Sequence, residues 1–510
     1  MSELLAPIVS ESADVPTGSS RWSFFLIAAL FVLTIGGALR VYHLGNRSLW
    51  FDEALTANTS RSTLTHMMEA TRSRGSAPVV HPLILYMVEK VGKGAVAVRT
   101  PSVLASLLAV FVMLAMVRAK VSQDAALFAA AILAVSASQI RYAQEVREYS
   151  LSVLFATILI YCLLRWEAVG SRSRNPVLLY VILFFVPLVQ YGLVLLAFAV
   201  LSTIILRLLL SRDTCFRLSQ VVIASTSLVA GGLLSFVLTL RYQFHPGQGQ
   251  WYLAANYFDP KTTSLLGFLG TNSKGLLSFF VPGQVIVLCF VIAAVIFCVK
   301  QALTREFDPL TLLVFSSVGI TLCAAVAKLY PYGGIRQCLF LAPGIALFAG
   351  IAIADLLQRL RPSQHSLAAA AFMVVILLSG YRGMLRLWPY GEYEDTKSIL
   401  KELARSSAPT DQVWVNHDAV EAFDFYLQER DPRFIYGQFH ADAKDYIPEL
   451  FESIDQRSDR LWLVFSHLQQ PSDRAEEQLI VNSLRPGWNL RSVLAPTNTE
   501  LYVANRRISP

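Results

Sequence analysis

The chain is poor in charged residues. Of its 510 residues only 15% are charged, 54% are hydrophobic, and the mean hydropathy is +0.49. Ordinary soluble proteins carry about a quarter charged residues, so this scarcity points away from a soluble enzyme and excludes a disordered chain. All six cysteines lie in or beside apolar runs, without the spacing of a disulfide framework or a zinc site. The composition therefore indicates a polytopic membrane protein.

The sequence also contains no P-loop, dinucleotide-binding fingerprint, internal repeat or low-complexity segment. The charges that are present are unevenly placed. Residues 390–510 hold 13 of the 43 basic and 20 of the 36 acidic residues, a net charge near −7, whereas the rest of the chain is near +14. This asymmetry predicts a basic, apolar body followed by an acidic, soluble domain.

Eleven apolar runs approach the ~20 residues that cross the hydrocarbon core as a helix. They are Trp22–Leu39, Val98–Val117, Ala125–Ile140, Tyr149–Leu164, Val177–Val189, Leu193–Leu210, Val221–Leu240, Leu276–Val299, Leu310–Ala327, Leu339–Leu357 and Leu367–Leu387. Residues 177–210 are too long for one span at ~1.5 Å per residue, so we divide them into two short helices that turn near Gln190 and Gly192. A shorter apolar stretch, Leu83–Val91, is expected at the interface.

Basic residues in short loops predict the orientation. With a cytoplasmic N-terminal tail over 1–21, five short basic loops face the cytoplasm, and an odd number of spans places the C-terminus outside. We therefore expect a transmembrane domain over 22–389, with outer loops at 41–97 and 241–275, and an extracytoplasmic domain over 390–510. The protein is expected in the plasma (inner) membrane.

The C-terminal region alternates helical and strand patterns. Helical spacing over Thr396–Ala404 and Ala419–Gln428 alternates with short apolar strands at Val413–Val415 and Leu461–Phe465, and Leu501–Val503 is expected as an edge strand. This alternation predicts a small α/β domain.

Two carboxylates, Asp52 and Glu53, follow the first span directly and stand beside Trp50 and Phe51. A carboxylate that is partly desolvated at a membrane surface has a raised pKa, which suits a general base. The alternative is an interfacial amphipathic helix, in which the aromatic residues anchor the chain and both carboxylates face water.

A second polar cluster, between the third and fourth spans, contains Arg141 and Arg147 on the same expected outer face. Guanidinium groups bind phosphate oxygens bidentately, so these arginines could hold a lipid phosphate. The alternative is a basic loop with internal ion pairs to Glu145 and Glu148.

Several of these segments recur in one order in a known family. The segments are Trp50-Phe51-Asp52-Glu53-Ala54, His81-Pro82, Arg99-Thr100-Pro101-Ser102, and Arg141-Tyr142 with Arg147 and Tyr149-Ser150. The chain resembles, over residues 22–360, the membrane glycosyltransferases of the GT-C fold, specifically the bacterial family related to protein O-mannosyltransferases and the lipid A aminoarabinose transferase.

This resemblance implies roles for individual residues. Asp52 is the expected general base, with Glu53 as its neighbour. Arg141, Tyr142, Arg147 and Arg336 are expected near the donor phosphate, and His81, Tyr149 and Tyr330 are candidates for further substrate contacts. Trp251 is a candidate on another ground, because it lies in an aromatic-rich outer loop whose rings can stack on a sugar; the alternative is an interfacial aromatic belt. The chain departs from the family pattern where His81-Pro82-Leu83 replaces His-Pro-Pro-Leu, and where Gln190-Tyr191 replaces His-Tyr.

The implied reaction is an inverting transfer of a sugar from a polyprenyl-phosphate donor to a lipid, glycan or protein acceptor at the outer face of the membrane. Arginines stabilise the leaving phosphate, and a carboxylate takes the acceptor proton. No cofactor is required, and a divalent metal is an open alternative that the sequence does not indicate. The expected partners are the polyprenyl-phosphate sugar donor, membrane lipids and an acceptor, with no nucleic acid. A transporter or flippase of a lipid-linked anion is the alternative, although such proteins tend to show repeats and charges near the midplane.

Overall fold

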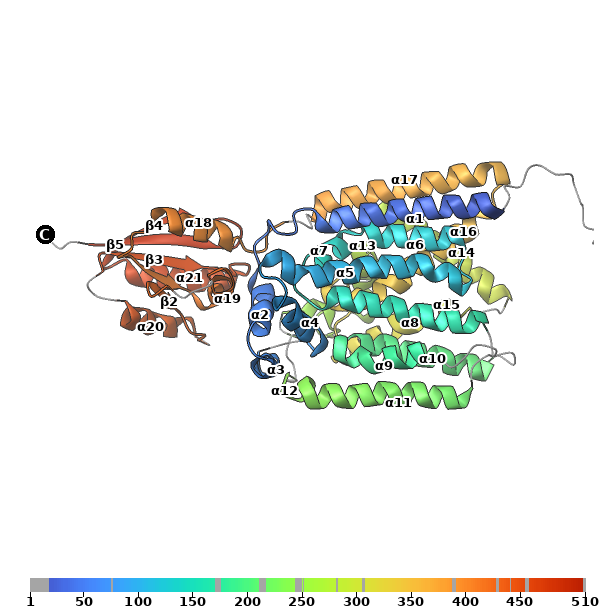
Figure 1. Cartoon of the computed structure of the whole chain (residues 1–510), viewed down its shortest axis with the longest axis horizontal. Helices are drawn as coiled ribbons and strands as arrows, with labels where there is room; N and C mark the ends of the chain where they lie inside the picture. The colour runs from blue at the N-terminus through green and yellow to red at the C-terminus, as the bar shows by residue number, and fades with distance from the viewer. Residues whose placement is uncertain are drawn as a thin grey trace, which may run out of the picture.

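The computed structural model describes residues 18–74, 77–169, 176–210, 217–243, 250, 252–280, 283–304, 308–387, 391–427, 431–440, 442–454 and 458–507. Long helices lie side by side in a bundle, and a separate sheet domain stands at one end of it (Figure 1). Three short helices lie between the two, α2 (Phe51–Ser60), α3 (Leu64–Ser73) and α4 (Val80–Glu89).

Within the described residues, seven helical segments are long and apolar enough to cross a membrane. They are α1 (Gly18–Val41), α5 (Ala95–Leu114) with η1 (Ala115–Ala119), α8 (Tyr149–Val169), α11 (Leu218–Ser235) with η3 (Phe236–Leu240) and α12 (Arg241–Gln243), α15 (Pro309–Val326), η5 (Arg336–Leu341) with α16 (Ala342–Leu357), and α17 (Pro362–Leu387). Two further helices, α6 (Gln123–Val135) and α7 (Ala137–Ala143), are bent by 60° relative to each other. They form an eighth span if the bent pair is counted as one. The multi-pass membrane architecture is confirmed, whereas the count of eleven stays a prediction.

Two long apolar stretches are each divided into two helices. The turn predicted in 177–210 is present, because α9 (Val177–Val189) ends before Gln190 and α10 (Leu193–Leu210) begins after Gly192. The single span predicted at Leu276–Val299 is wrong. Instead α13 (Leu265–Phe280) ends and α14 (Gln284–Thr304) begins around Gly283, whose φ of +86° is incompatible with a continuous right-handed helix. The predicted outer loop 241–275 therefore includes the first part of α13.

The bend between α6 and α7 is stabilised by a buried arginine from α1. The last carbonyls of a helix have no partner within the helix, and in an apolar bundle water cannot satisfy them. Arg40 is fully buried and donates to the carbonyls of Leu133 and Ala134 at 3.0 and 2.8 Å, and to the Ser106 hydroxyl at 2.8 Å. Arg40 therefore has a structural role, because its guanidinium group holds these helices together.

Close helix packing requires a small residue on α16. A Cβ added at Gly350 would lie 2.3 Å from the carbonyl oxygen of Ala125 and 3.0 Å from the amide nitrogen of Ala129, both on α6. Such backbone contacts cannot be relieved by a rotamer change, and small residues commonly allow this approach between membrane helices.

Gly350→Ala is therefore expected to lower the free energy of unfolding by about 1–3 kcal/mol through overpacking. Titration with a denaturing detergent, followed by circular dichroism, measures the change. Gly319→Ala on α15 is the matched control, because a Cβ there meets nothing within 4 Å. Equal destabilisation by both variants would contradict the packing argument.

The C-terminal domain contains a five-stranded sheet in the order β2-β1-β3-β5-β4. Its elements are α18 (Thr396–Ser406), β1 (Gln412–Val415), α19 (His417–Tyr426), β2 (Phe434–Tyr436), η6 (Ala443–Asp445), α20 (Tyr446–Ser453), β3 (Arg460–Phe465), α21 (Pro471–Leu484), β4 (Trp488–Leu494) and β5 (Glu500–Arg506). Strands β1, β2 and β3 are parallel, whereas β5 runs antiparallel to both β3 and β4.

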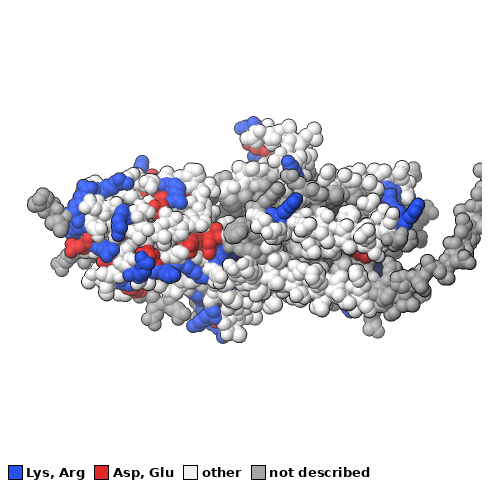
Figure 2. Space-filling view, turned by 90° about the horizontal axis from the view of Figure 1, so that it is seen from above, with Lys and Arg blue, Asp and Glu red and all other residues white. Residues whose placement is uncertain are grey.

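The predicted α/β character of this domain is confirmed. The prediction of an edge strand at Leu501–Val503 is wrong, because β5 is paired on both sides, by β3 and β4. The edge position belongs to β4, whose partly exposed, polar pattern gave little strand signal. Charged side chains concentrate over this domain and at the far end of the molecule, with a largely uncharged band between them (Figure 2).

Candidate active site

The candidate site is built on the first turn of α2. This helix begins at Phe51, and its N-cap residue, Trp50, makes no side-chain cap hydrogen bond. Asp52 and Glu53 lie in the first turn, where the helix dipole favours negative charge. Because consecutive helix residues point in different directions, the two carboxylates reach different surroundings.

The Asp52 carboxylate is shared by two arginines from distant parts of the chain. Its Oδ2 lies 3.2 Å from Nη1 of Arg147, in the loop before α8, and 3.0 Å from Nη2 of Arg336, at the start of η5. The side chains of Asp52 and Arg336 are 21% and 24% exposed, so the pair remains accessible at the edge of the bundle. Arg147 is more buried and also lies 3.4 Å from Glu148.

The surroundings of Asp52 act on its pKa in opposite directions. Burial by itself would raise the pKa, but the positive charges of Arg147, Arg336 and His467 outweigh this effect and hold the pKa below its usual value. The carboxylate is therefore ionised in the free protein.

Aromatic rings surround the arginines. The guanidinium carbon of Arg336 lies 5.2 Å from the ring centroid of Trp50 and 5.8 Å from that of Tyr149. Arg147 lies 5.6 Å from the same Tyr149 ring, which packs edge-on against Tyr142 at 5.5 Å. Rings at this distance stabilise cations while keeping bulk water away from them. The site thus combines Asp52, Arg147, Arg336, Tyr149 and Tyr142, all predicted from the sequence.

Glu53 is turned away from these arginines and is fully buried. Its two oxygens accept from Arg99 of α5 at 2.9 and 2.8 Å, and one also accepts from the Val146 amide at 3.0 Å. Arg99 in turn donates to the carbonyls of Leu44, Arg47 and Ser48. Glu53 therefore joins α2, α5 and the loop before α8, and both of its oxygens are occupied.

Arg141 contacts Glu145 and the segment that precedes the C-terminal domain. Its Nε donates to Glu145 at 3.0 Å, another nitrogen donates to the Gly391 carbonyl, and the guanidinium carbon lies 3.8 Å from the Tyr393 ring centroid. These contacts connect the bundle to the segment that leads into the C-terminal domain.

His81, at the start of α4, is 2% exposed, and neither of its ring nitrogens has a hydrogen-bond partner among the described residues. Burial, together with the charge of Arg147, lowers the pKa of this imidazole to about 3, so it is neutral. Buried polar groups without partners are uncommon in native proteins. A ligand beside Arg147 could supply the missing partner.

Two further residues, Tyr330 and Gln190, belong to the surroundings of the site. The Tyr330 hydroxyl donates to the carbonyl of Gln337, next to Arg336, at 2.9 Å. Gln190, where the chain departs from the family pattern, accepts from Ser152 at 2.6 Å. Gln190 also donates to the Gln337 carbonyl at 3.4 Å, so both side chains bind the backbone next to Arg336. Trp251 lies outside the described residues.

Two residues from the C-terminal part of the chain, which were not among the predicted candidates, also reach the site. Glu394 accepts from the Phe51 amide at 3.1 Å, and His467 is bonded to Glu394. The His467 ring lies parallel to that of Trp50 and is tilted by 55° relative to that of Phe51. No signal in the sequence pairs them with α2, because more than 340 residues separate Phe51 from Glu394.

The residues around Asp52 do not match the requirements of a divalent cation. Hard cations need several oxygen ligands that are free to coordinate. Here Asp52 is paired with two arginines and Glu53 with Arg99, and no cluster of three possible metal-ligating side chains occurs among the described residues. The side chains around Asp52 therefore do not form a metal site.

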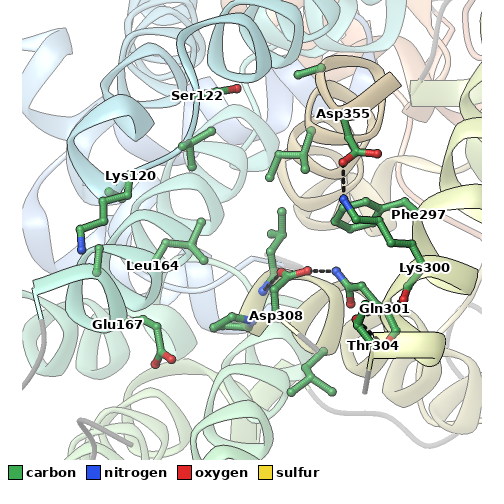
Figure 3. A pocket seen from close by; sticks show the side chains of 18 of the residues that line it. Lys120, Ser122, Leu164, Glu167, Phe297, Lys300, Gln301, Thr304, Asp308 and Asp355 are labelled. Carbon is green, nitrogen blue, oxygen red and sulfur yellow. Dashed lines mark hydrogen bonds and ion pairs between the residues drawn. The ribbon is translucent and has the colours of Figure 1, made fainter. Parts of the chain in front are cut away.

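A cavity of about 1150 Å³, whose lining is shown in Figure 3, lies at the C-terminal ends of α8 and α16. Glu167, in its lining, follows Arg147 by 20 residues, or about 30 Å along α8. Four charged residues of the lining form two ion pairs, Lys300 with Asp355 at 2.6 Å and Arg207 with Glu167. This cavity is thus remote from Asp52.

Part of the chain resembles a known protein family in sequence. A family model described as dolichyl-phosphate-mannose-protein mannosyltransferase matches residues 76–239, a shorter range than 22–360. This range includes His81 and Arg147 but neither Asp52 nor Arg336. No curated protein sequence matches the chain.

Solved structures match over nearly the whole chain. ArnT from Cupriavidus metallidurans bound to undecaprenyl phosphate is 15% identical, with 95% of this chain and 98% of that chain covered and a TM-score of 0.53. Its apo state is 16% identical, with the same coverage and a TM-score of 0.51. The oligosaccharyltransferase from Archaeoglobus fulgidus in complex with Zn and sulfate is 11% identical, covers 93% of this chain and 72% of that chain, and has a TM-score of 0.55. The expected GT-C fold is thereby confirmed.

Proposed function

From the fold that this chain shares with membrane glycosyltransferases, we propose that it transfers a sugar from a polyprenyl-phosphate carrier to an acceptor. The observation that carries the proposal is the Asp52 carboxylate placed between Arg147 and Arg336 at an accessible edge of the membrane bundle. The undecaprenyl phosphate bound to ArnT, a protein of the same fold, supports a donor of this class.

Arg147 and Arg336 stabilise the leaving group. When the bond between the sugar and the lipid phosphate breaks, negative charge develops on the phosphate. Arg147 and Arg336 stabilise that charge by charge-assisted hydrogen bonds in a site partly shielded by Tyr149 and Trp50. The product lipid phosphate stays in the membrane, so no nucleotide-binding domain is needed.

Asp52 takes the proton from the acceptor. In the free protein both arginines neutralise it and hold its pKa low, which makes it a weak base. A donor phosphate that binds Arg147 and Arg336 competes with Asp52 for these partners and adds a negative charge beside it. Both changes raise the pKa of Asp52. Donor binding thus converts Asp52 into a competent base for an acceptor hydroxyl or amine, and attack opposite the leaving phosphate inverts the anomeric carbon.

We further propose that this end of the bundle faces outward, with the C-terminal domain extracytoplasmic, and that no metal or other cofactor takes part. Asp52, Arg147 and Arg336 carry the chemistry. Glu53 and Arg141 hold the structure around it, because their charges are already paired with Arg99 and with Glu145.

Reconstitution of the full chain in vesicles tests this function. Purified protein is supplied with polyprenyl-phosphate sugars and with lipid, glycan or protein acceptors, and both sugar transfer and translocation of the lipid carrier are measured. We expect transfer to at least one acceptor class. Translocation without any transfer would favour a flippase and overturn the proposal.

Arg336→Gln is expected to weaken binding of undecaprenyl phosphate at least tenfold, because it removes one charged donor from a partly desolvated phosphate site. Microscale thermophoresis in detergent measures the affinity. Arg359→Gln is the matched control, since Arg359 also binds a single carboxylate, Asp355, but at the remote end of α16. Unchanged affinity of Arg336→Gln would remove Arg336 from the phosphate site.

A further inference from the structure

The C-terminal domain packs directly on α2, the helix that carries Asp52. Asn58 of α2 donates to the Glu421 carbonyl of α19 at 2.8 Å, and the Leu49 amide donates to the Tyr426 hydroxyl at 2.7 Å. Arg61 stacks on the Phe425 ring at 3.9 Å. Apolar residues of both parts form one buried cluster, which includes Leu49, Ala54, Ala57, Leu85, Val98, Val146, Ala422 and Phe425. The C-terminal domain therefore helps to hold α2, and with it Asp52, in place.

One residue of this region caps α2 from outside the helix. The first amides of a helix lack partners within it and are normally satisfied by the side chain of the N-cap residue. Trp50 provides no such bond. Instead the fully buried carboxylate of Glu394 accepts from the Phe51 amide at 3.1 Å, one residue before Asp52, and from the Ser466 hydroxyl at 3.0 Å.

His467 completes this arrangement. Its Nδ1 lies 2.8 Å from the second oxygen of Glu394, and its ring lies parallel to that of Trp50, with centroids 6.5 Å apart. The backbone of His467, two residues after β3, adopts a left-handed conformation with a φ of +61°. Left-handed non-glycine residues often mark functional positions. The cap of the catalytic helix thus depends on a residue that the sheet domain supplies.

We propose that the Glu394–His467 pair is a positioning element of the active site, which holds the first turn of α2 so that Asp52 meets Arg147 and Arg336. This inference rests on the proposed function. It assigns the C-terminal domain a role in catalysis and predicts that the pair acts only while His467 is protonated, since the imidazolium charge balances Glu394 and faces Asp52.

The charges around His467 determine its titration. Burial alone would lower the pKa of His467, but Glu394, Asp418 of α19 and Asp52 of α2 together raise it to about 9. The protonated form is therefore complete at neutral pH and is lost as the pH rises through about 9. Glu392, which accepts from the Ser48 amide, has its pKa raised by burial to about 7, so its titration is a separate step.

Two variants test the pair. His467→Asn removes the imidazole but tolerates the left-handed backbone, and Glu394→Gln retains an oxygen for the Phe51 amide while losing the charge. We expect the transfer rate, kcat, to fall about tenfold in His467→Asn and severalfold in Glu394→Gln, because small displacements of a catalytic group are costly. The donor KM should change less than about twofold. The alkaline loss of activity near pH 9 should disappear in His467→Asn.

A second measurement needs no substrate. A protonated imidazole quenches the fluorescence of a stacked indole. The emission of Trp50 is obtained as the difference between wild type and Trp50→Phe. We expect this emission to rise as the pH passes about 9, when His467 loses its proton. This step should be absent in His467→Asn. The matched control is His440→Gln, because His440 and Glu449 form another pair at 2.8 Å in the same domain and should affect neither measurement.

The outcomes separate the two proposals. If His467→Asn and Glu394→Gln transfer sugar at the wild-type rate and the Trp50 titration is unchanged in His467→Asn, the pair has no positioning role, although the glycosyltransferase proposal stands. A control variant that loses as much activity as His467→Asn would also overturn the inference. If wild type transfers no sugar, the proposed function fails, and the fluorescence titration alone reports on the pair.

Discussion

Asp52→Asn is expected to lower the rate of sugar transfer about 10³-fold while the protein remains folded and binds undecaprenyl phosphate at least as tightly as wild type. The loss follows from removal of the general base, which contributes about 10²–10⁴-fold in enzymes. Retained binding follows from the geometry, because Asp52 occupies the same two arginines that we assign to the phosphate. An asparagine competes for them less strongly than a carboxylate does.

Transfer assays in vesicles and lipid-phosphate binding in detergent check both parts of this expectation. Asp355→Asn is the matched control, since Asp355 is also paired with two cations, Lys300 and Arg359, at 2.6 and 2.7 Å, but at the remote end of the bundle. Full activity of Asp52→Asn would exclude Asp52 as the base. Loss of lipid-phosphate binding would exclude the competition between carboxylate and phosphate.

Glu53, the adjacent carboxylate, is expected to contribute to stability rather than to catalysis. Glu53→Ala should lower the free energy of unfolding by about 3–5 kcal/mol, because it leaves the buried Arg99 without its ionic partner. The stabilisation by Glu53 also depends on pH. Burial would raise its pKa, but Arg99 and further hydrogen bonds hold it below the usual value. The contribution is therefore present at neutral pH and is lost as the pH falls through that lowered pKa.

Unfolding in a denaturing detergent, compared between Glu53→Ala and Asp52→Asn, measures this difference. Activity of Glu53→Ala, normalised to the folded fraction, should stay within about an order of magnitude of wild type, since Glu53 does not face the two arginines. Wild-type stability of Glu53→Ala would contradict the structural role, and a normalised loss as large as that of Asp52→Asn would restore Glu53 as a catalytic residue.

Hydropathy predicted most of the bundle because the bilayer imposes one simple requirement, a long apolar helix. It failed at Leu276–Val299, where the break around Gly283 depends on backbone conformation rather than on polarity. In the C-terminal domain the central strands β1 and β3 were found from their apolar runs, whereas β2 and the edge strand β4 were missed. A strand that is half exposed has weak polarity contrast, and its place depends on its partners.

The sequence by itself determined that this is a membrane protein with an acidic soluble domain, and it singled out Asp52, Arg147 and Arg336 as candidates. Only the family resemblance distinguished Asp52 from Glu53 at that level, because both are acids in the same short segment. The tertiary structure supplied the physical distinction, by placing Arg147 and Arg336 at Asp52, Arg99 at Glu53, and Glu394 at the start of α2. The physical reason is that the role of a carboxylate depends on its burial and on its charged neighbours, and here those neighbours come from residues that are 46 to 343 positions distant in the chain.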